Sequence, residues 1–507
     1  MDSTIAAMTY VRTPATLQVF RVAVAGDWQS ALHVLDEHWA EIWYAVDPTD
    51  LRRLLAQAPT HLLSTLKNAN FLARATGHGP VEDLLAPQQP PRRPTDLNAT
   101  AQYIGDLRLR GLPAAAMEQV RRIGDHVRAG RGQLVDATGG TTALWSVQVG
   151  ITALLAGDVA TARGMLLEAT TSHRPDKFPF IVREATAKLA LTHAVAGNIV
   201  EAITWSDRAR ATPRTESWVE GLINDTIWLT DYLCAVDTLD PRAEAMRLAK
   251  PSPLEHLEFW AVALQAQVRH LTLTRRAPQA HALCMAVAAA GLPRPGADGT
   301  FATALSDAEL SIIDGSGYHA AREPDVLTSA QAVLTEGLRL FVTGQFQAVL
   351  ELAGKGLPPT HDDRTTLALR LLEAQSLTAL GHPINGRQLL LKTLQKALDC
   401  QVLSSLRYLT AATLTSIRGT DAGTMAADLV DRHAVPTLEL EPVLESSLTE
   451  AEVEVMRLLQ QGRSRAEIAE ELHLSINTVK TQLRSAYRKL NVTSRGDANV
   501  RFARLGL

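Results

Sequence analysis

The last 60 residues contain the stretch that decides the fold of this part of the chain: Leu448-Thr-Glu-Ala-Glu-Val-Glu-Val-Met-Arg-Leu-Leu-Gln-Gln-Gly462, then Ser464 to Leu472, then Ser475 to Leu490. Thr449 and Glu452 have the spacing of a capping box, and Ser464 and Glu467 repeat it. Ser475 precedes a third segment in which apolar residues recur at helical spacing. The stretch therefore predicts three capped helices, with a short turn between the last two.

The third segment has two unlike faces. The apolar face carries Val479, Leu483, Ala486, Tyr487 and Leu490. The opposite, polar and basic face carries Lys480, Thr481, Arg484 and Arg488. A helix that is buried on one side and basic on the other, and that follows a short helix and a tight turn, is typical of a helix that reads the major groove of DNA.

These residues resemble the LuxR/NarL-type DNA-binding domain along its whole length. The matching positions are Leu448-Thr449, Glu452, Val455, Leu458-Leu459, Gly462, Ser464, Glu467-Ile468-Ala469, Leu472, Ser475, Asn477-Thr478-Val479-Lys480-Thr481, Leu483-Arg484, Tyr487-Arg488-Lys489-Leu490, Val492 and Ser494-Arg495. Four positions depart from the family pattern: Ile476 stands where proline is usual, Gln482 where histidine is common, Arg463 where an apolar residue is frequent, and Asn491 where glycine is usual. The resemblance implies a four-helix domain that binds DNA as a dimer.

The resemblance also assigns roles to individual residues. Base edges are expected to be read by Lys480, Thr481 and Arg484. Phosphates are expected to be held by Asn477, Thr478, Arg488 and Lys489. The final helix, Ser494 to Leu505, resembles the family's dimerisation helix, with an expected interface at Val500 and Ala503. Activators are commoner than repressors in this family, so RNA polymerase is an expected partner.

Charge is distributed unevenly along the chain. Residues 478–507 contain seven Lys and Arg against one acid, Asp497, which gives a net charge of about +6. The whole chain carries −4, so the residues before Thr478 carry about −10. A basic segment on an acidic protein is expected to attract phosphates.

Length and composition limit the remaining possibilities. A chain of 507 residues is expected to hold two or three domains. No apolar run reaches the roughly 18 residues that span a bilayer, and the N-terminus lacks the pattern of a signal peptide. A cytoplasmic protein without a membrane partner is therefore expected. The cysteines, Cys234, Cys284 and Cys400, are too far apart for a zinc site and odd in number, so we expect reduced core residues.

Residues 10–430 show helical periodicity and no convincing strand, which predicts an all-α body. A helix that ends in glycine before a new helix recurs along it. Gly157 and Gly197 are 40 residues apart, and Gly344 and Gly381 are 37 apart. The glycine can take the positive φ that ends one helix, and a following Asp or Asn can cap the next. A period near 40 predicts an α-solenoid.

Asp237 and Arg276 fall near two further steps of this period. The pattern resembles the tetratricopeptide-like (TPR-like) sensor superhelix of the MalT-type regulators. Those regulators usually begin with an ATPase module, but this chain contains no Gly-x-x-x-x-Gly-Lys-[Ser/Thr] loop. A regulator without an ATPase, a phosphorylated receiver or a cofactor is therefore expected.

Composition shifts predict five segments. They are a helical subdomain (1–85), a proline-rich linker (86–95), a TPR-like sensor domain (96–430), an acidic linker (431–446) and a LuxR-type helix-turn-helix domain (447–507).

The body offers little that resembles an enzyme. The only compact His/Asp cluster in the body is His361-Asp362-Asp363. Helix capping explains this cluster better than catalysis does, so no enzymatic activity is expected. Tryptophans are packing residues by default. An alternative is an effector pocket formed by Trp218, Trp228, His256 and Trp260. Two functions of the body stay open: sensing of a small-molecule effector, and a scaffold for a protein partner that controls DNA binding.

Overall fold

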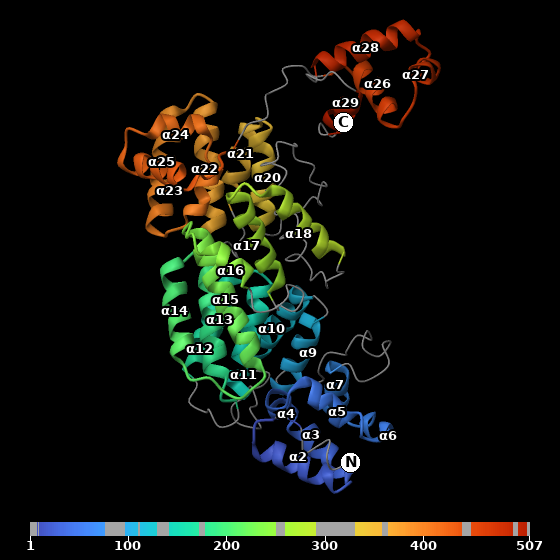
Figure 1. Ribbon diagram of the computed structural model, residues 1–507, viewed down its shortest axis with the longest axis vertical. Coiled ribbons are helices and arrows are strands. Elements are labelled where there is room, and N and C mark those ends of the chain that lie inside the picture. The colour runs from blue at the N-terminus through green and yellow to red at the C-terminus, as the bar shows by residue number, and fades with distance from the viewer. Residues whose placement is uncertain are drawn as a thin grey trace.

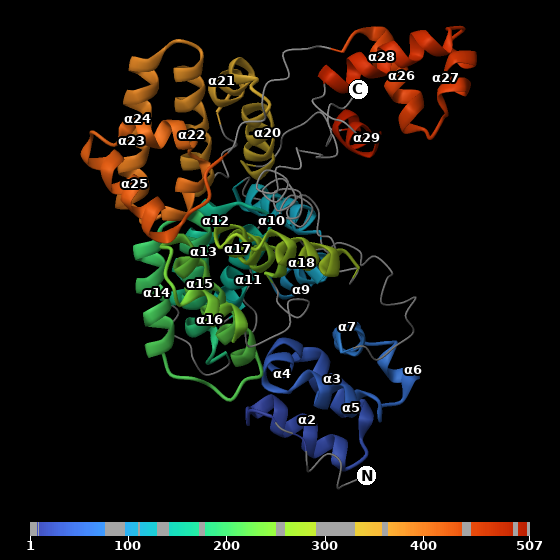
Figure 2. The same cartoon turned by 45° about the horizontal axis from the view of Figure 1, so that its top comes forward.

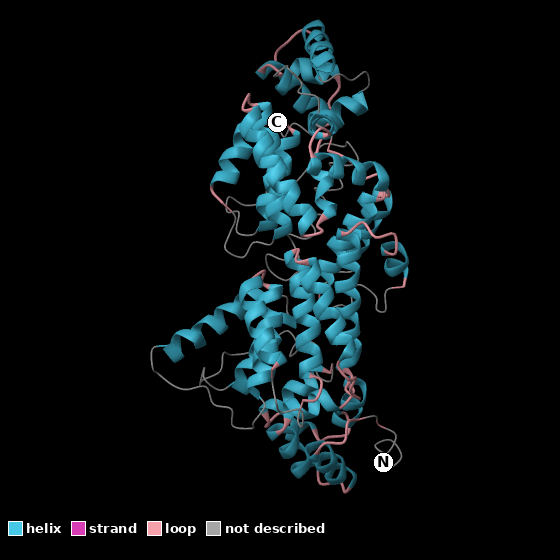
Figure 3. Ribbon diagram, turned by 90° about the vertical axis from the view of Figure 1, so that its left-hand side faces the viewer, coloured by secondary structure: helices cyan, strands magenta, loops and turns pink. Residues whose placement is uncertain are grey.

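The computed structural model describes residue 8 and residues 10–76, 97–109, 112–128, 141–171, 178–249, 259–289, 330–356, 363–438, 448–489 and 495–503. Helices make up the regular secondary structure of these ranges, as the cyan ribbons of Figure 3 show. The β-type pairings within them are two isolated bridges, Tyr10 with Val46 and Thr410 with Leu438. The all-α prediction is confirmed.

The first group of helices is drawn in blue in Figure 1. It comprises α2 (Pro14–Val24), α3 (Trp28–Glu37), α4 (Trp39–Ala45), α5 (Pro48–Leu55), α6 (Thr60–Leu63) and α7 (Lys67–Ala75). Polar side chains define where these helices begin. Thr13 accepts a hydrogen bond from the N–H of Thr16 at 3.2 Å, and α2 then starts with a proline. Asp47 begins α5 in the same way, accepting from the N–H of Thr49 at 2.8 Å.

The second group is an array of stacked helices. It comprises α9 (Leu97–Leu109), α10 (Pro113–Arg128), α11 (Thr141–Leu155), α12 (Val159–Thr170), α13 (Ile181–Ala196), α14 (Ile199–Ala211), α15 (Val219–Asp237), α16 (Ala243–Leu248), α17 (Trp260–Leu273) and α18 (Ala277–Ala289). Each helix packs against the next, and α9, α11, α13, α15 and α17 also pack in succession against one another. Stacked helix–turn–helix units produce this alternation. It supports the solenoid, whereas the likeness to tetratricopeptide repeats stays a prediction.

The junction between α11 and α12 follows the sequence prediction. Gly157 has a φ of 77°, and its N–H donates to the carbonyl of Leu154 at 3.1 Å. The N–H of Asp158 donates to the carbonyl of Ala153 at 2.8 Å, which completes a Schellman motif. The Asp158 carboxylate then accepts from the N–H of Thr161 at 3.0 Å. Glycine therefore ends one helix and the aspartate begins the next.

Other junctions differ from the sequence prediction. Leu239 and Arg275 take the left-handed conformation, with φ of 56° and 57°, so the turns after α15 and α17 form without glycine. Arg276 directly follows its turn residue, but Asp237 is the last residue of α15 and lies buried. Asn198 precedes α14 without a side-chain capping hydrogen bond. The backbone geometry recurs, whereas the residue types vary.

The third group follows α18 in the described chain. It comprises α20 (Ala330–Val342), α21 (Phe346–Gly354), α22 (Asp363–Ala379), α23 (Pro383–Asp399), the 3₁₀ helix η2 (Leu403–Tyr408), α24 (Ala411–Ile417) and α25 (Asp421–His433). Because α25 continues to His433, residues 431–433 are helical rather than part of the predicted linker. Farther on, the N–H of Leu438 donates to the carbonyl of Leu409 at 2.9 Å. The chain is therefore held on this group as far as Leu438.

The first group and the array share one buried core. The first group lies against one end of the array (Figure 2), and α4 forms the contact. Trp43 packs edge-on against Trp218, with ring centroids 5.5 Å apart, and Tyr44 lies 4.8 Å from Phe180. The hydroxyl of Ser217 donates to the carbonyl of Tyr44 at 2.6 Å. The predicted subdomain boundary at residue 85 therefore does not separate two hydrophobic cores.

A buried polar cluster joins the array to the third group. Asp237 is fully buried and forms an ion pair with Arg364 of α22. The hydroxyl of Ser404 in η2 donates to Asp237 at 2.5 Å, and Arg269 of α17 lies 3.7 Å away. A buried carboxylate is stable only when charges and donors surround it. These contacts fix η2 and α22 against the ends of α15 and α17.

Candidate nucleic-acid interface

Four helices form a core of their own near the end of the chain, shown in red in Figure 1. They are α26 (Glu450–Gln460), α27 (Arg465–Glu471), α28 (Ile476–Lys489) and α29 (Arg495–Ala503). Helix α26 packs against each of the other three, and α27 packs against α28. The fully buried side chains at the centre are Val455, Met456, Ile468, Val479, Ala486, Ala498 and Phe502.

Both predicted capping boxes are confirmed. The Thr449 hydroxyl accepts from the N–H of Glu452 at 3.3 Å, and the Glu452 carboxylate accepts from the N–H of Thr449 at 2.7 Å. Ser464 and Glu467 repeat both bonds at 3.3 and 2.7 Å. Hydrogen bonds from the backbone and side chain of Ser464 lower the pKa of Glu467. Both helices therefore begin with their first N–H groups partly satisfied.

The turn between α27 and α28 contains a feature that the sequence analysis missed. His473 has a φ of 54°, and its N–H donates to the carbonyl of Glu470 at 3.2 Å. The N–H of Leu474 donates to Ala469 at 2.8 Å, so the turn is again a Schellman motif, without glycine. Histidine is enriched among non-glycine residues with positive φ, and this was the available signal. Ser475 then caps α28, accepting from the N–H of Thr478 at 3.0 Å.

Helix α28 presents the two faces that its sequence predicts. Val479, Leu483 and Ala486 are buried in the four-helix core. The residues expected to meet DNA that the structure describes are all exposed: Asn477, Thr478, Lys480, Thr481 and Arg484. The Thr481 hydroxyl donates to the carbonyl of Asn477 at 2.9 Å, and its oxygen lone pairs can still accept a hydrogen bond. One face of α28 is thus fixed by packing while a polar, basic face meets solvent.

Some predicted site residues fall outside the described side chains. Arg488 and Lys489 lie within α28, and Val500 and Ala503 lie within α29, but the structure describes only their backbone.

One arginine of the basic segment has a structural partner. A guanidinium nitrogen of Arg495, the first residue of α29, donates to the carbonyl of Leu459 at 3.2 Å. It also donates to the carbonyl of Arg463 at 3.1 Å. These carbonyls belong to the end of α26 and the turn before α27, where a positive charge is favourable. Sequence reasoning counted Arg495 in the basic surface, but its guanidinium is engaged within the domain.

The structure gives the tryptophans of the predicted effector pocket packing partners. The indole N–H of Trp218 donates to the carbonyl of Trp43 at 2.7 Å, and that of Trp228 donates to Met246 at 3.0 Å. Trp218 is the N-cap of α15 and Trp228 lies ten residues farther on in this helix, which is about 15 Å along the helix axis. They therefore do not meet at one point.

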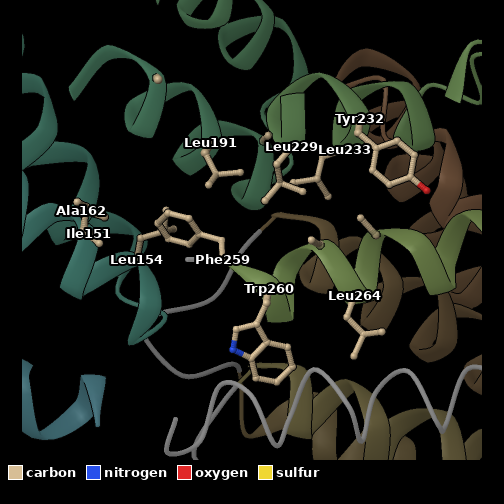
Figure 4. Packing of buried hydrophobic residues seen from close by; sticks show 14 of the residues in the cluster. Ile151, Leu154, Ala162, Leu191, Leu229, Tyr232, Leu233, Phe259, Trp260 and Leu264 are labelled. Carbon is tan, nitrogen blue, oxygen red and sulfur yellow. The ribbon is translucent and has the colours of Figure 1, made fainter. Parts of the chain in front are cut away.

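Of the remaining two members of the predicted pocket, Trp260 is the one that lies within the described residues. In Figure 4, Phe259 points toward Leu154 and Ile151 of α11, whereas Trp260 lies on another side of α17 with Leu264. Trp260 is buried. His256 lies outside the described residues, as do His361 and Asp362. The pocket stays a prediction.

Other candidate chemistry is limited in the described ranges. They contain no group of three or more His, Cys, Asp or Glu side chains that could hold a metal ion. The three cysteines in the described ranges form no disulfide. Burial, together with the charge of Asp237, raises the pKa of the Cys234 thiol to about 12. No helix in these ranges is long and apolar enough to cross a membrane.

The paired caps, the tight turn and the exposed face of α28 define a helix-turn-helix protein. Residues 446–502 match the model of the family described as bacterial regulatory proteins, luxR family. The spore germination protein GerE of Bacillus subtilis is 42% identical over 59 residues, which are 12% of this chain and 80% of GerE. The chain belongs to the luxR family of bacterial regulatory proteins.

Two further relatives match this chain over a smaller share of their own length than GerE does. The HTH-type transcriptional regulator MalT of Vibrio campbellii is 40% identical over 72 residues, which are 14% of this chain and 8% of MalT. The nitrate/nitrite response regulator protein NarP of Escherichia coli is 47% identical over 57 residues, 11% of this chain and 26% of NarP. The chain therefore matches less than a tenth of MalT and about a quarter of NarP.

Proposed function

We propose that this chain is a transcription regulator that binds specific DNA sequences through α28. The observation that carries the proposal is the exposed row of Lys480, Thr481 and Arg484 on a helix whose other face is buried. Lys and Arg donate to guanine in the major groove, and threonine can contact either a polar base edge or a thymine methyl group. These three residues read bases in this proposal.

Phosphate contacts hold the same helix in register. Asn477, Thr478, Arg488 and Lys489 are the residues proposed for this role. Two copies bind as a dimer through α29, with Val500 and Ala503 at the interface, so that two half-sites are read together. The proposed outcome is activation, with RNA polymerase as the partner.

Selection of DNA tests the proposal directly. The full chain is incubated with random-sequence duplexes, and bound molecules are amplified over several rounds. The proposal expects a shared sequence to be enriched. The double variant Lys480→Ala/Arg484→Ala should enrich none, while Arg457→Ala, which removes an exposed charge from α26, should enrich the same sequence. Enrichment of the same sequence by the double variant would refute the role of α28.

The helical body regulates DNA binding in the second part of the proposal. Its division into a subdomain (1–85), linkers and a sensor array (96–430) is retained, with a small-molecule effector as the ligand. The hydrogen bond from the N–H of Leu438 to the carbonyl of Leu409 supports this coupling, because it holds the chain that leads to the DNA-binding domain on the body as far as Leu438. An effector that changes the body can thereby change the freedom of the attached domain.

A protein partner is the alternative ligand of the body. Native mass spectrometry of the purified chain separates the two possibilities: a bound metabolite supports the sensor. Affinity for the selected DNA is then measured for the full chain with and without the metabolite, and for residues 445–507 alone. Equal affinity in all three, at fixed salt and corrected for dimerisation, would exclude regulation of DNA binding by the body.

A further inference from the structure

Ile476 is an unusual residue on the exposed side of the four-helix domain. It is the first residue of α28, and 48% of its surface is exposed. Among the described residues of this domain, Ile476 is the only large hydrophobic residue whose side chain is exposed. Val479 and Leu483 on the same helix are buried. The core is therefore complete without Ile476.

Helix stability does not explain isoleucine at this position. The first position of a helix favours proline, which is pre-shaped for it and loses no hydrogen bond there. Isoleucine is β-branched and has a lower helix propensity than straight-chain residues. The Ser475 cap already begins the helix. A half-exposed isoleucine thus contributes little to either capping or packing.

Its position aligns it with the proposed base readers. Ile476, Lys480 and Arg484 are four residues apart, so they follow one another along one side of α28 at steps of about 6 Å. Ile476 lies at the N-terminal end of this row. In helix-turn-helix proteins, the N-terminal residues of the second helix are those that contact base edges.

The chemistry of the groove limits what this side chain can recognise. The major groove offers hydrogen-bond donors and acceptors and one apolar group, the 5-methyl of thymine. The isoleucine side chain has no hydrogen-bonding atom. On the basis of the proposed function, we propose that Ile476 is a specificity-determining residue that contacts the 5-methyl group of a thymine next to the base read by Lys480.

The test removes the methyl group from the DNA and the side chain from the protein. Each thymine of the selected duplex is replaced singly by deoxyuridine, and affinity for the full chain is measured by mobility shift. Loss of one buried methyl should weaken binding about fourfold at one thymine. Ile476→Ala should bind the thymine duplex more weakly and lose the sensitivity to uracil at that position, because the two changes remove the same contact.

A matched control uses another exposed isoleucine, Ile384 of the third group. Ile384 lies in the first turn of α23 and is 80% exposed, so Ile384→Ala removes the same side-chain atoms at a position far from α28 in the sequence. It should retain the fourfold uracil effect. Ile476→Val, which keeps two methyl groups, should fall between the natural chain and Ile476→Ala; this variant also serves if Ile476→Ala lowers the melting temperature.

Three results would overturn the inference. Uracil sensitivity of equal size in Ile476→Ala and the natural chain would show that Ile476 makes no such contact. Sensitivity that disappears in Thr481→Ser instead would assign the methyl contact to Thr481. If the full chain selects no DNA, the proposed function itself fails, whereas selection without an Ile476-dependent thymine overturns this inference alone.

Discussion

Asp237 and Arg364 are 127 residues apart in the sequence, yet they form a buried ion pair between α15 and α22. The same guanidinium also donates to the carbonyls of Ala194 and Val195 at 2.7 and 2.8 Å, at the end of α13. One side chain therefore binds the ends of two array helices. The third group, which leads to the linker, is fixed to the array at this point.

Loss of the Asp237 carboxylate should destabilise the body. Asp237→Ala leaves Arg364 and Arg269 buried without their counter-charge, which is expected to cost about 3 to 5 kcal/mol. Chemical denaturation of the full chain, followed by circular dichroism, measures the change. Asp207→Asn is the control, since Asp207 is exposed and pairs with Arg210 on the surface, and it should change stability by less than about 1 kcal/mol. Equal effects of the two substitutions would contradict this account.

The same pair predicts how stability depends on pH. Burial alone would raise the pKa of Asp237, but Arg364 and Arg269, with hydrogen bonds from Arg364 and Ser404, together lower it. Its contribution is therefore present above the ordinary carboxyl pKa of about 3.9 and is lost as pH falls below that value. The stability difference between the natural chain and Asp237→Asn should narrow from pH 5 toward pH 2. A constant difference over this range would mean that Asp237 does not titrate as described.

Arg495 should act on the stability of the four-helix domain rather than on phosphate binding. Arg495→Ala removes two hydrogen bonds to carbonyls near the end of α26 and should cost about 1 kcal/mol. For Arg495→Ala, the slope of log affinity for DNA against log salt should match that of the natural chain. Arg457→Ala, which removes an exposed arginine from α26 of the same domain, controls for loss of charge. A salt slope reduced by about one unit in Arg495→Ala would instead identify a phosphate contact.

Lys489 should show the opposite behaviour. As a proposed phosphate contact, Lys489→Ala should weaken binding to selected and random duplexes alike and reduce the slope of log affinity against log salt by about one unit. Mobility-shift titrations at several salt concentrations give this slope. An unchanged slope, or a loss confined to the selected sequence, would remove Lys489 from the phosphate contacts.

The four-helix domain should fold by itself. Helices α26 to α29 contribute to a hydrophobic cluster separate from that of the body, and both capping boxes lie inside the fragment. A fragment of residues 445–507 should therefore give a dispersed NMR spectrum and a cooperative melt. A disordered fragment would mean that residues of the body complete its core.

Local features were the ones that sequence could predict. The capping boxes at Thr449 and Ser464 depend on residues three positions apart, and the two faces of α28 follow from helical periodicity. Gly157 and Asp158 likewise determine a junction through bonds within a few residues. Such patterns are visible in the sequence because the partners are neighbours in it.

Features that depend on distant partners could not be predicted from the sequence. Asp237 lies at the end of α15, as its place in the repeat period predicts, but its buried ion pair with Arg364 joins residues that are 127 positions apart. The hydrogen bond from the Trp218 indole to the carbonyl of Trp43 likewise joins residues that are 175 positions apart. The positive φ of His473 was missed because no glycine marks the turn, and histidine is a weaker signal for this conformation.

The ratio of affinities for selected and random duplexes tests the central claim most directly. If α28 reads bases, the full chain should bind its selected sequence about 10³-fold or more tighter than random DNA at physiological salt. Arg484→Ala should lower this ratio by the equivalent of about 1 to 3 kcal/mol, while Arg457→Ala should leave it unchanged. A ratio near one for the natural chain, or an undiminished ratio in Arg484→Ala, would contradict sequence reading by this face of α28.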